Sequence, residues 1–315
     1  MTPEISVQVP VRNGGAGFAV HLDSLRAQDL AGVPWELVIA DDGSQPPVEG
    51  SFDLRFPGNV AVRIVRREGS GNRPAARNIA WQAASAPVSL LTDGDLKLSP
   101  DVLRRHLEIR REGGWTVVMG ARINAWSEDA SPWQRWFDTR AMGGKPAGEF
   151  PPRYFITGNL SLPTSLLREA NGFDEAIDRY GGEDTEFGLR IARTGVSLHW
   201  EPGIRADHLD TVTVREHSAK MVEYGGSGLR HTLGKHPEAG GMLGSGWIRP
   251  VLSRPIRPGT LVMRMAAKLM LLPAVYRGIL RWMEAVGRPR FLFTYLSVGG
   301  CLLGLSGKDF RRNDA

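Results

Sequence analysis

The segment "PVSLLTDGD", residues 87–95, joins a short apolar strand directly to two carboxylates, Asp93 and Asp95. An acidic pair in a turn usually accepts hydrogen bonds from nearby backbone N–H groups, which would make it purely structural. Hard divalent cations also choose carboxylate oxygens and commonly bridge them to substrate phosphates. The segment alone leaves both interpretations open, and the pattern around it favours one of them.

Strand-like and helix-like segments alternate on both sides of this stretch. The strand-like segments are short and rich in Val, Ile and Leu, and they cover residues 5–11, 35–42, 60–68, 87–92 and 115–123. The helix-like segments between them cover residues 17–30, 72–85 and 99–113, and the last has Ser99 as its expected N-cap and Pro100 at its first position. This β-α-β-α order predicts an α/β fold with a mainly parallel sheet and helices on both faces.

Polar side chains follow three of these strands at the point where each strand ends. Arg12 follows "VQVPV", Asp41 and Asp42 end "LVIADD", and Asp93 and Asp95 follow "VSLLT". In open sheets of this kind, ligands bind beyond the carboxyl ends of the strands. The placement of these side chains therefore predicts a nucleotide-type pocket at this edge of the sheet.

Composition restricts the class of partner. The chain has 315 residues, of which 42% are hydrophobic, so it can form one large domain or two smaller ones. The formal net charge of +5 would suit a nucleic acid, an anionic membrane surface or a phosphorylated ligand. A nucleic-acid partner is not expected, because no module of that kind is recognisable and the acidic strand ends would repel a polyanion.

Cysteine usage and the N-terminal segment bear on location. Cys301 is the single cysteine, so no intrachain disulfide can form, which fits a reducing cytoplasm. The first residues, "MTPEISVQVPVRNGG", lack the basic segment followed by a long apolar run that marks a signal peptide. We therefore expect a cytoplasmic location.

The character of the sequence changes near residue 211. The segments 214–233, 259–287 and 289–307 follow a helical pattern and mix apolar residues with Arg and Lys. Their apolar runs are interrupted by charge or are shorter than the roughly 20 residues that a spanning helix needs. We expect amphipathic helices that either pack on the core or lie on a membrane, and we place a domain boundary between residues 210 and 211.

Three further groups of residues could bind a ligand or take part in catalysis, and each also has a purely structural interpretation. Arg73 and Arg77 follow the Gly-rich "GSGN" and suit a diphosphate, but they also fit a solvated basic turn. His208 follows the strand-like "VSLHW" and a Glu-Pro-Gly turn, and a lone histidine is more often structural than a metal ligand. In "YGGEDTEFGLR", residues 180–190, Asp184 fits the N-cap or first turn of a helix. The glycines before it would also allow a ligand to approach the backbone closely.

The ordered set "VQVPVRN", "VIADDGS", "AARN", "LLTDGD" and "GGEDTEFGLR" resembles the family 2 glycosyltransferases with the GT-A fold. The pattern "GGED.EFG.R" is most similar to the branch that includes chondroitin polymerase and the galactosyl- and N-acetylgalactosaminyltransferases. The resemblance covers roughly residues 5–210, which would form the catalytic domain, with residues 211–315 as a helical extension. It implies an inverting, metal-dependent hexosyltransferase that uses a nucleotide-sugar, with UDP as the expected nucleotide.

The resemblance also implies a role for individual residues. "TDGD" is similar to the DxD element, so Asp95 would bind Mn²⁺ or Mg²⁺, Asp93 would approach the ribose and the metal, and His208 matches a downstream metal ligand. Asp184 matches the catalytic base. The expected substrate-binding residues are Pro10, Val11, Arg12, Asp42, Arg73, Arg77, Asp93, Gly158, Asn159, Gly182 and Glu183. The element "TDGD" lacks the third acidic residue that many members carry.

The acceptor implied is a carbohydrate or a lipid-linked sugar, as in surface polysaccharide or glycolipid assembly, with a peripheral contact at the inner face of the membrane. Two other functions fit part of the pattern. A nucleotidyltransferase-like enzyme would account for "DDGS" and "TDGD" but not for "GGED" followed by His208. A basic nucleic-acid-binding protein would account only for the charge.

Overall fold

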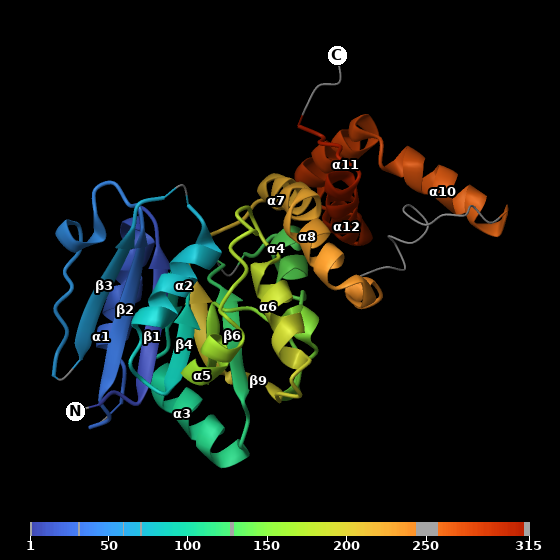
Figure 1. Cartoon of the computed structure of the whole chain (residues 1–315). Helices are drawn as coiled ribbons and strands as arrows, with labels where there is room; N and C mark the ends of the chain where they lie inside the picture. The colour runs from blue at the N-terminus through green and yellow to red at the C-terminus, as the bar shows by residue number, and fades with distance from the viewer. Residues whose placement is uncertain are drawn as a thin grey trace. The chain divides into compact units, whose positions relative to one another are not determined.

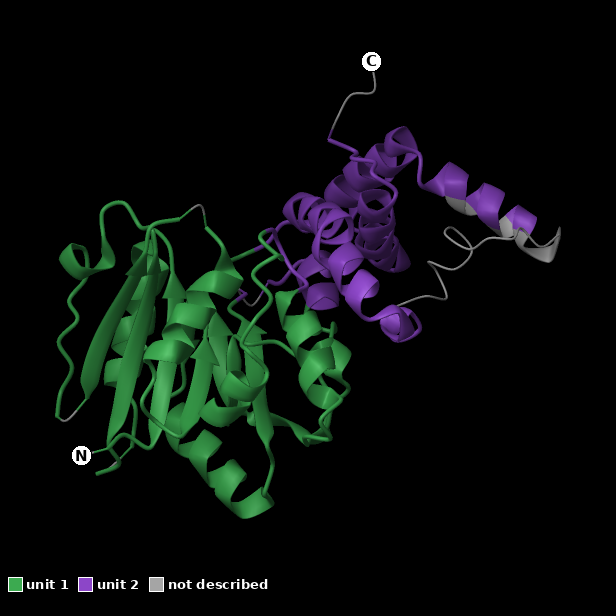
Figure 2. Cartoon of the chain, in the orientation of Figure 1, with its two compact units in different colours: residues 1–125, 138–178, 183–211 green, residues 126–137, 179–182, 212–315 purple. Residues whose placement is uncertain are grey.

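The structure is a computed structural model that describes residues 2–30, 32–58, 60–69, 71–126, 129–243 and 258–311 (Figure 1). The chain divides into two compact units, which Figure 2 shows in different colours. The first comprises residues 1–125, 138–178 and 183–211, and the second comprises residues 126–137, 179–182 and 212–315. Two short segments that precede residue 210 thus belong to the second unit.

The first unit is built on one sheet. In the described residues the sheet has nine strands in the order β3-β2-β1-β4-β8-β6-β9-β5, and β7 pairs with β9. The four strands β3, β2, β1 and β4 run parallel to one another, and β8 is antiparallel to both β4 and β6. The strands are β1 Ile5–Val11, β2 Trp35–Asp42, β3 Ala61–Arg67, β4 Val88–Thr92, β5 Leu96–Leu98, β6 Val117–Asn124, β7 Gly148–Glu149, β8 Asn159–Pro163 and β9 Leu198–His208.

Helices cover both faces of this sheet (Figure 1). They are α1 Gly15–Arg26, α2 Arg73–Ala83, α3 Val102–Gly113, α5 Thr164–Glu169 and α6 Glu183–Ala192, with short 3₁₀ turns η1 Val48–Gly50 and η2 Pro152–Tyr154. Alternate residues of a strand point to opposite faces. Accordingly Leu37 and Ile39 join the core under α1 and α3, whereas Val38 and Ala40 pack against α2. The predicted α/β fold, with a sheet flanked by helices, is confirmed.

Strand β9 differs from the expectation of a strand followed by a Glu-Pro-Gly turn. It is one strand of 11 residues that runs through Pro202 and Gly203. Its register with β6 shifts there, because Gly120 pairs with Glu201 while the next residue, Ala121, pairs with Arg205. The expected turn is thus an irregularity within a continuous strand. The strand therefore continues to His208, at the sheet edge that carries the acidic residues.

Helix α3 begins later than expected. Its N-cap is Asp101, and the prediction of Ser99 as the N-cap is wrong. The backbone N–H of Ser99 donates to the carbonyl of Arg205 at 3.0 Å, and the carbonyl of Ser99 accepts from the side chain of Gln28 at 2.9 Å. These bonds hold Ser99 beside β9, so the helix starts at Val102 and the prediction of Pro100 as its first residue is also wrong.

The second unit is helical in the described residues. Its helices are α4 Pro132–Phe137, α7 Val214–Gly226, α8 Gly228–Lys235, α10 Pro258–Met270, α11 Pro273–Val286 and α12 Phe291–Leu305, with a 3₁₀ turn η3 Pro237–Gly240. Two of the three expected helical segments are each divided in two. One division lies at Ser227 and the other just before Pro273, which cannot continue a helix from the preceding turn without losing a hydrogen bond. No described helix is both long and apolar enough to cross a membrane.

Helices α7 and α12 pack with their backbones in contact. A Cβ atom on Gly304 would lie 2.0 Å from the carbonyl oxygen of Val222, and one on Gly225 would lie 2.0 Å from the carbonyl oxygen of Cys301. Both separations are far below van der Waals contact, so only glycine fits at either position. Large side chains, including Tyr276 and Phe293, fill the core around this crossing.

We expect Gly304→Ala to destabilise the helical unit by about 1–3 kcal/mol, because the two helices must move apart to admit the methyl group. Gly278→Ala is the matched control, since Gly278 lies in α11 and a Cβ atom there would have no described neighbour within 4 Å. That change should stabilise the protein by about 0.5–1 kcal/mol through helix propensity. Thermal unfolding followed by circular dichroism measures both, and equal shifts in melting temperature would contradict the close packing of α7 and α12.

Candidate active site

The carboxyl ends of β1, β2 and β4 meet at one edge of the sheet, because these strands are parallel neighbours. The edge therefore carries Arg12, Asp41, Asp42 and Asp93, the residues that the sequence places after these strands. Strand β5 begins beyond the turn that follows Asp93 and pairs antiparallel with β9. This pairing adds the end of β9 to the same part of the sheet.

Asp95 and His208 are brought together by that pairing. Leu96, which follows Asp95, is paired with His208, and the Nε2 atom of His208 lies 3.3 Å from Oδ2 of Asp95. The Nδ1 atom of His208 lies 3.3 Å from Oδ1 of Asn124 in β6. Donation from Nδ1–H to Asn124 leaves the lone pair of Nε2 directed to Asp95. The other oxygen of Asp95, Oδ1, is buried and has no hydrogen-bond partner in the described residues.

These two side chains fit part of a divalent-metal site. A carboxylate oxygen without a partner beside an imidazole nitrogen is a suitable pair of ligands for Mn²⁺ or Mg²⁺. No group of three or more His, Cys, Asp or Glu side chains in the described ranges could hold a metal ion. The remaining coordination positions of an ion held by Asp95 and His208 would therefore have to be filled by a bound ligand and by water.

Asp93 is held by arginines and not by a neighbouring acid. Its Oδ1 accepts from Arg77 at 2.6 Å, and its Oδ2 lies 3.4 Å from Nη1 of Arg122. Burial alone would raise the pKa of Asp93, but the neighbouring arginines outweigh it and lower the pKa to about 2. Gly158 lies against this carboxylate, because a Cβ atom there would be 2.9 Å from Oδ2 of Asp93.

Arg77 supports Asp93 from inside the protein. Its side chain is only 2% exposed, and its guanidinium lies 5.9 Å from the centre of the Phe173 ring. As folded, it offers almost no surface to a ligand, and its Nε and Nη1 atoms have no hydrogen-bond partner among the described residues. Arg73, by contrast, has a side chain that is 55% exposed at the start of α2.

The two acids at the start of α6 have different environments. Asp184 lies in the first turn, as expected, and its carboxylate accepts from the hydroxyl of Thr157 at 2.7 Å and from its backbone N–H at 3.3 Å. Glu183 is buried with Oε1 3.3 Å from Arg73. Burial, and then the charge of Asp184, raises the pKa of Glu183. Thr157 is fully buried, so it fixes the orientation of the Asp184 carboxylate.

Sequence reasoning missed Thr157, Arg122 and Asn124. Thr157 immediately precedes the predicted Gly158, but a threonine next to a strand carries no periodic or motif signal. Arg122 and Asn124 lie near the end of β6, where only the pairing of β6 with β8 and β9 shows that they face the acids. Because Thr157 and Gly158 are adjacent in the chain, they bring Asp184 and Asp93 close together. Thr157 binds Asp184 while Gly158 touches Asp93.

The side chain of Asn159 is committed within the sheet. Its Nδ2 donates to the carbonyls of Ala121 at 3.1 Å and Ile204 at 3.2 Å, where β6 and β9 shift register. Its Oδ1 lies 3.0 Å from Nε2 of His106, which is fully buried and whose pKa burial lowers to about 4. Both N–H groups of the Asn159 amide are thus used inside the protein, and its side chain stabilises the sheet beneath Gly158.

Gly181 and Gly182 belong to the second unit, where they pack closely. Both have positive φ angles, 78° and 104°, which side chains other than glycine rarely adopt. A Cβ atom on Gly182 would lie 2.7 Å from Cα of Gly228, and one on Gly181 would lie 3.2 Å from the ring of Tyr224. Local packing therefore explains both glycines. That Gly182 contacts a sugar stays a prediction.

The first two strands contribute the remaining predicted residues. Pro10 is half-buried, Val11 is buried and Arg12 is exposed. The guanidinium of Arg12 lies against Gly71, where a Cβ atom would be 1.9 Å from Nη1. Asp42 is buried and forms an ion pair with Arg67 at the end of β3.

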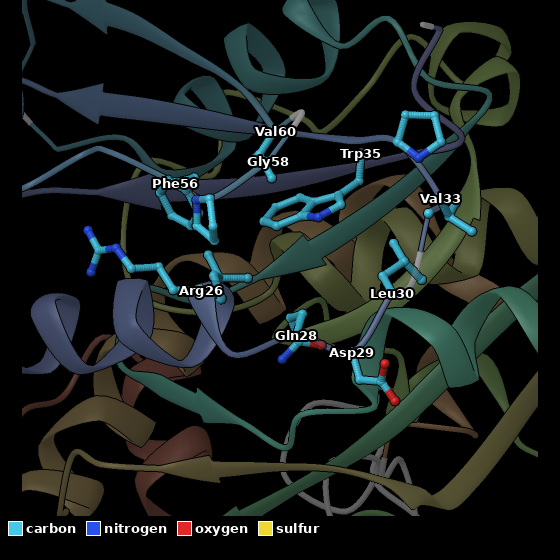
Figure 3. Close-up of a pocket in the computed structure, with 13 residues that line it drawn as sticks. Arg26, Gln28, Asp29, Leu30, Val33, Trp35, Phe56, Gly58 and Val60 are labelled. Carbon is cyan, nitrogen blue, oxygen red and sulfur yellow. The ribbon is translucent and has the colours of Figure 1, made fainter.

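A cavity of about 370 Å³ lies at the other end of β2, where the strand begins at Trp35 (Figure 3). A strand rises about 3.3 Å per residue, so the two ends of β2 are separated by about 23 Å. Apolar side chains form most of the wall of this cavity. Arg26 also lines it, with its guanidinium 5.1 Å from the centre of the Phe56 ring and its Nε donating to the carbonyl of Arg55. The cavity shares no residue with the acidic edge of the sheet.

Two family models match the chain, namely "Glycosyl transferase family 2" over residues 6–172 and "N-terminal domain of galactosyltransferase" over residues 145–216. Among curated proteins, validoxylamine A glucosyltransferase of Streptomyces hygroscopicus subsp. limoneus is 27% identical over 239 residues, with 65% of this chain and 52% of that protein covered. Chondroitin synthase of Escherichia coli is 25% identical over 237 residues, with 65% and 34% covered. The chain thus spans about half the length of the first relative and a third of the second.

Solved structures share the fold. The mannosyltransferase PcManGT of Pyrobaculum calidifontis, in complex with GDP-Man and Mn²⁺, matches with a TM-score of 0.58 and 17% identity, covering 98% of this chain and 89% of that one. S. aureus TarS 1–349 in complex with UDP matches with a TM-score of 0.54 and 16% identity, covering 96% and 90%.

The expected resemblance is confirmed by a family model that covers more than half of the chain. Matches to a chondroitin synthase and to a polypeptide N-acetylgalactosaminyltransferase support the expected branch. The chain belongs to glycosyl transferase family 2.

Proposed function

We propose that the chain transfers a sugar from a nucleoside-diphosphate donor to an acceptor hydroxyl, with inversion at the anomeric carbon and Asp184 as the general base. The observation that carries the proposal is the short link from Asp184 to Thr157, then to Gly158 and Asp93. Asp184 contacts Thr157 and Asp93 contacts the next residue, Gly158, which supports a role for these two acids in one site. The GDP-Man and UDP complexes that share the fold support a nucleotide-sugar donor.

The chemistry follows from the environment of Asp184. An acceptor hydroxyl has a pKa far above neutral, so its proton must be removed as the oxygen attacks. Thr157 occupies part of the hydrogen-bonding capacity of the Asp184 carboxylate and leaves it able to accept that proton. The acceptor oxygen bonds to the anomeric carbon as the bond from that carbon to the diphosphate oxygen breaks. A single displacement inverts the configuration.

Asp95 and His208 would hold Mn²⁺ or Mg²⁺, and the ion would neutralise negative charge that develops on the departing diphosphate. Asp93 approaches the donor with its carboxylate fixed by Arg77 and Arg122. Arg73 is exposed at the start of α2, where its guanidinium can reach a phosphate oxygen. By the resemblance, UDP is the proposed nucleotide.

We expect the divalent cation to strengthen nucleotide binding through Asp95 and His208. Calorimetric titration of UDP and GDP with Mn²⁺ and with EDTA gives the affinities. Asp95→Asn should remove most of the gain that Mn²⁺ provides, because the amide is a weaker metal ligand. Asp207→Asn is the matched control, since Asp207 precedes His208 in β9 and points to the opposite face of the sheet. Equal affinities with Mn²⁺ and EDTA in the wild type would reject the metal site.

We expect Asp184→Asn to reduce turnover by about 10²–10⁴-fold while donor binding changes little, because loss of a general base affects the proton transfer alone. Asparagine keeps the shape and can still accept a hydrogen bond from Thr157 through its carbonyl. The adjacent change Glu183→Gln should instead weaken binding of the sugar or acceptor. Turnover, donor affinity and melting temperature are compared for both. Near-normal turnover of the Asp184→Asn variant would place the base elsewhere.

The proposed acceptor is lipid-linked or lies at a membrane, and we propose that the helical unit binds an anionic lipid surface. Helix α10 exposes Leu261, Met265 and Leu269, which lie on one face because they are spaced four residues apart. The side chain of Met265 is 64% exposed, and that of Val262, next to Leu261 in the chain, is 74% exposed. Lys268 is exposed in the same helix, and Trp282 is exposed in α11. An apolar stripe beside cations and an exposed tryptophan is typical of an interfacial helix.

Charge favours lipid over a second copy of the chain as the occupant of this surface. Residues 239–283 contain no acidic side chain and seven basic ones, namely Arg249, Arg254, Arg257, Arg264, Lys268, Arg277 and Arg281. The first three lie outside the described residues. Two such surfaces would repel each other, whereas anionic headgroups attract each basic residue by about 1 kcal/mol.

We expect the protein to sediment with vesicles rich in phosphatidylglycerol at low salt and to be released at high salt. The double variant Val262→Glu/Met265→Glu should lose this binding. Val20→Glu is the control, because Val20 is an exposed apolar residue of α1 in the first unit. Absence of sedimentation with anionic vesicles at low salt would reject the membrane proposal.

A further inference from the structure

Strand β5, which Asp95 immediately precedes, is short and lies at the end of the sheet. It has three residues, Leu96–Leu98, and in the strand order of the described sheet it comes last, beside β9. The outer side of such a strand presents backbone N–H and C=O groups that no neighbouring strand pairs. Because so short a strand forms few hydrogen bonds with β9, the position of Asp95 depends on what occupies this outer side.

Side chains of helix α1 occupy the outer side of β5. The Nδ1 atom of His21 lies 2.6 Å from the carbonyl oxygen of Leu96. One helical turn later, Oγ of Ser24 accepts from the backbone N–H of Leu98 at 3.1 Å. The helix thus takes the place of a further strand along β5.

The same helix contacts the turn that carries Asp95. A Cβ atom on Gly17 would lie 3.8 Å from both Cα and Cβ of Asp95, and one on Gly94 would lie 3.1 Å from the ring of Phe18. The rings of Phe18 and His21 are stacked with their centroids 6.3 Å apart, and both residues are fully buried. Helix α1 therefore supports the turn from below and holds the strand that follows it.

The hydrogen bond of His21 fixes a position more than it stabilises the fold. A carbonyl oxygen can only accept, so the proton of the ring lies on Nδ1. Burial lowers the pKa of His21, so the ring is neutral and has this single N–H. The other nitrogen, Nε2, is buried without a hydrogen-bond partner among the described residues, which costs free energy. The ring thus satisfies the Leu96 carbonyl but leaves another buried atom without a partner, and the net gain in stability is small.

We propose that His21 is a positioning residue for the metal ligand Asp95. The inference rests on the proposed function, in which Asp95 and His208 bind a divalent cation. Leu96 is held from two sides, because it is paired with His208 in β9 and its carbonyl accepts from His21 in α1. The His21 hydrogen bond thereby fixes Asp95, the next residue along the chain, relative to His208.

The separation of the two ligand atoms fits this role. Two ligands at right angles around an octahedral ion, each about 2.1 Å from it, lie about 3 Å apart. Oδ2 of Asp95 and Nε2 of His208 are 3.3 Å apart, so they are already close to that spacing. Without the N–H of His21, the Leu96 carbonyl would lose its partner, and β5 could shift away from β9 and widen this separation.

The test is the affinity for UDP, measured by calorimetric titration with Mn²⁺ and with EDTA. The ratio of the two affinities is the metal gain. His21→Leu removes the N–H group at similar volume and should reduce the metal gain by about tenfold or more, the loss typical when a group that orients a metal ligand is removed. The affinity for UDP in EDTA should stay nearly unchanged, because no metal ion then takes part in binding.

Two further variants separate positioning from stability. His21→Asn should keep the metal gain within about threefold of the wild type, because its side-chain N–H group can take the place of Nδ1–H. His217→Leu is the matched control, since His217 is also buried and its Nε2 lies 2.5 Å from Oγ of Ser297 in the helical unit. That change should lower the melting temperature and leave the metal gain as it is.

If His21→Leu does not fold, His21→Met replaces it, because the flexible methionine side chain fills irregular space and also lacks an N–H donor. A folded variant of this kind that keeps the full metal gain overturns the inference. So does one that weakens UDP binding equally with Mn²⁺ and with EDTA, since a purely structural role would have that effect. A wild type without any metal gain would instead reject the proposed metal site, and the inference with it.

Discussion

The site depends on one electrostatic constraint, which is that carboxylates gathered at a sheet edge and withdrawn from water need opposite charges nearby. Parallel strands bring the acids together because their carboxyl ends coincide, and without compensation the acids would repel one another. In the described residues most of these acids have an arginine. The pairs are Asp41–Arg66, Asp42–Arg67, Asp93 with Arg77 and Arg122, and Glu183–Arg73.

Two acids at this edge are exceptions, and they are the residues for which chemistry is proposed. Asp95 lies against His208, and Asp184 against Thr157, and in the described part of the chain neither forms an ion pair with an arginine or lysine. An arginine would occupy the oxygens that a metal ion or an acceptor proton needs. The Thr157 hydroxyl orients the Asp184 carboxylate without neutralising it, and an Nε2 lone pair of His208 beside Asp95 leaves both side chains able to bind a metal ion. The choice of partner thus separates acids that hold the site in place from acids that can react.

The sequence was sufficient to predict the alternating strands, the acids at their ends and the family, because each depends on local patterns. Local patterns could not identify partners that come from distant segments, and the pairing of His208 with Asp95 was expected only from the family resemblance. Thr157 meets Asp184 only after β8 and α6 have packed, and the approach of His208 to Asp95 depends on β9 continuing through Pro202 and Gly203. The Ser99 cap failed for the same reason, since a bond to Arg205 in another strand overrides a local helix signal.

The arginines also explain why a divalent cation is expected to accompany the donor. They already balance the acids that they contact, so of the arginines named at this edge Arg12 alone, which forms no ion pair in the described residues, is left for a nucleoside diphosphate. Arg77 has unused N–H groups but is buried, and Arg73 is shared with Glu183. A diphosphate that arrived alone would add negative charge beside Asp93, Asp95 and Asp184. Burial and the charge of Asp184 already raise the pKa of Glu183, so the site resists further negative charge. A divalent cation bound with the donor by Asp95 and His208 would nearly cancel the charge of the diphosphate and keep the edge balanced in both the free and the bound state.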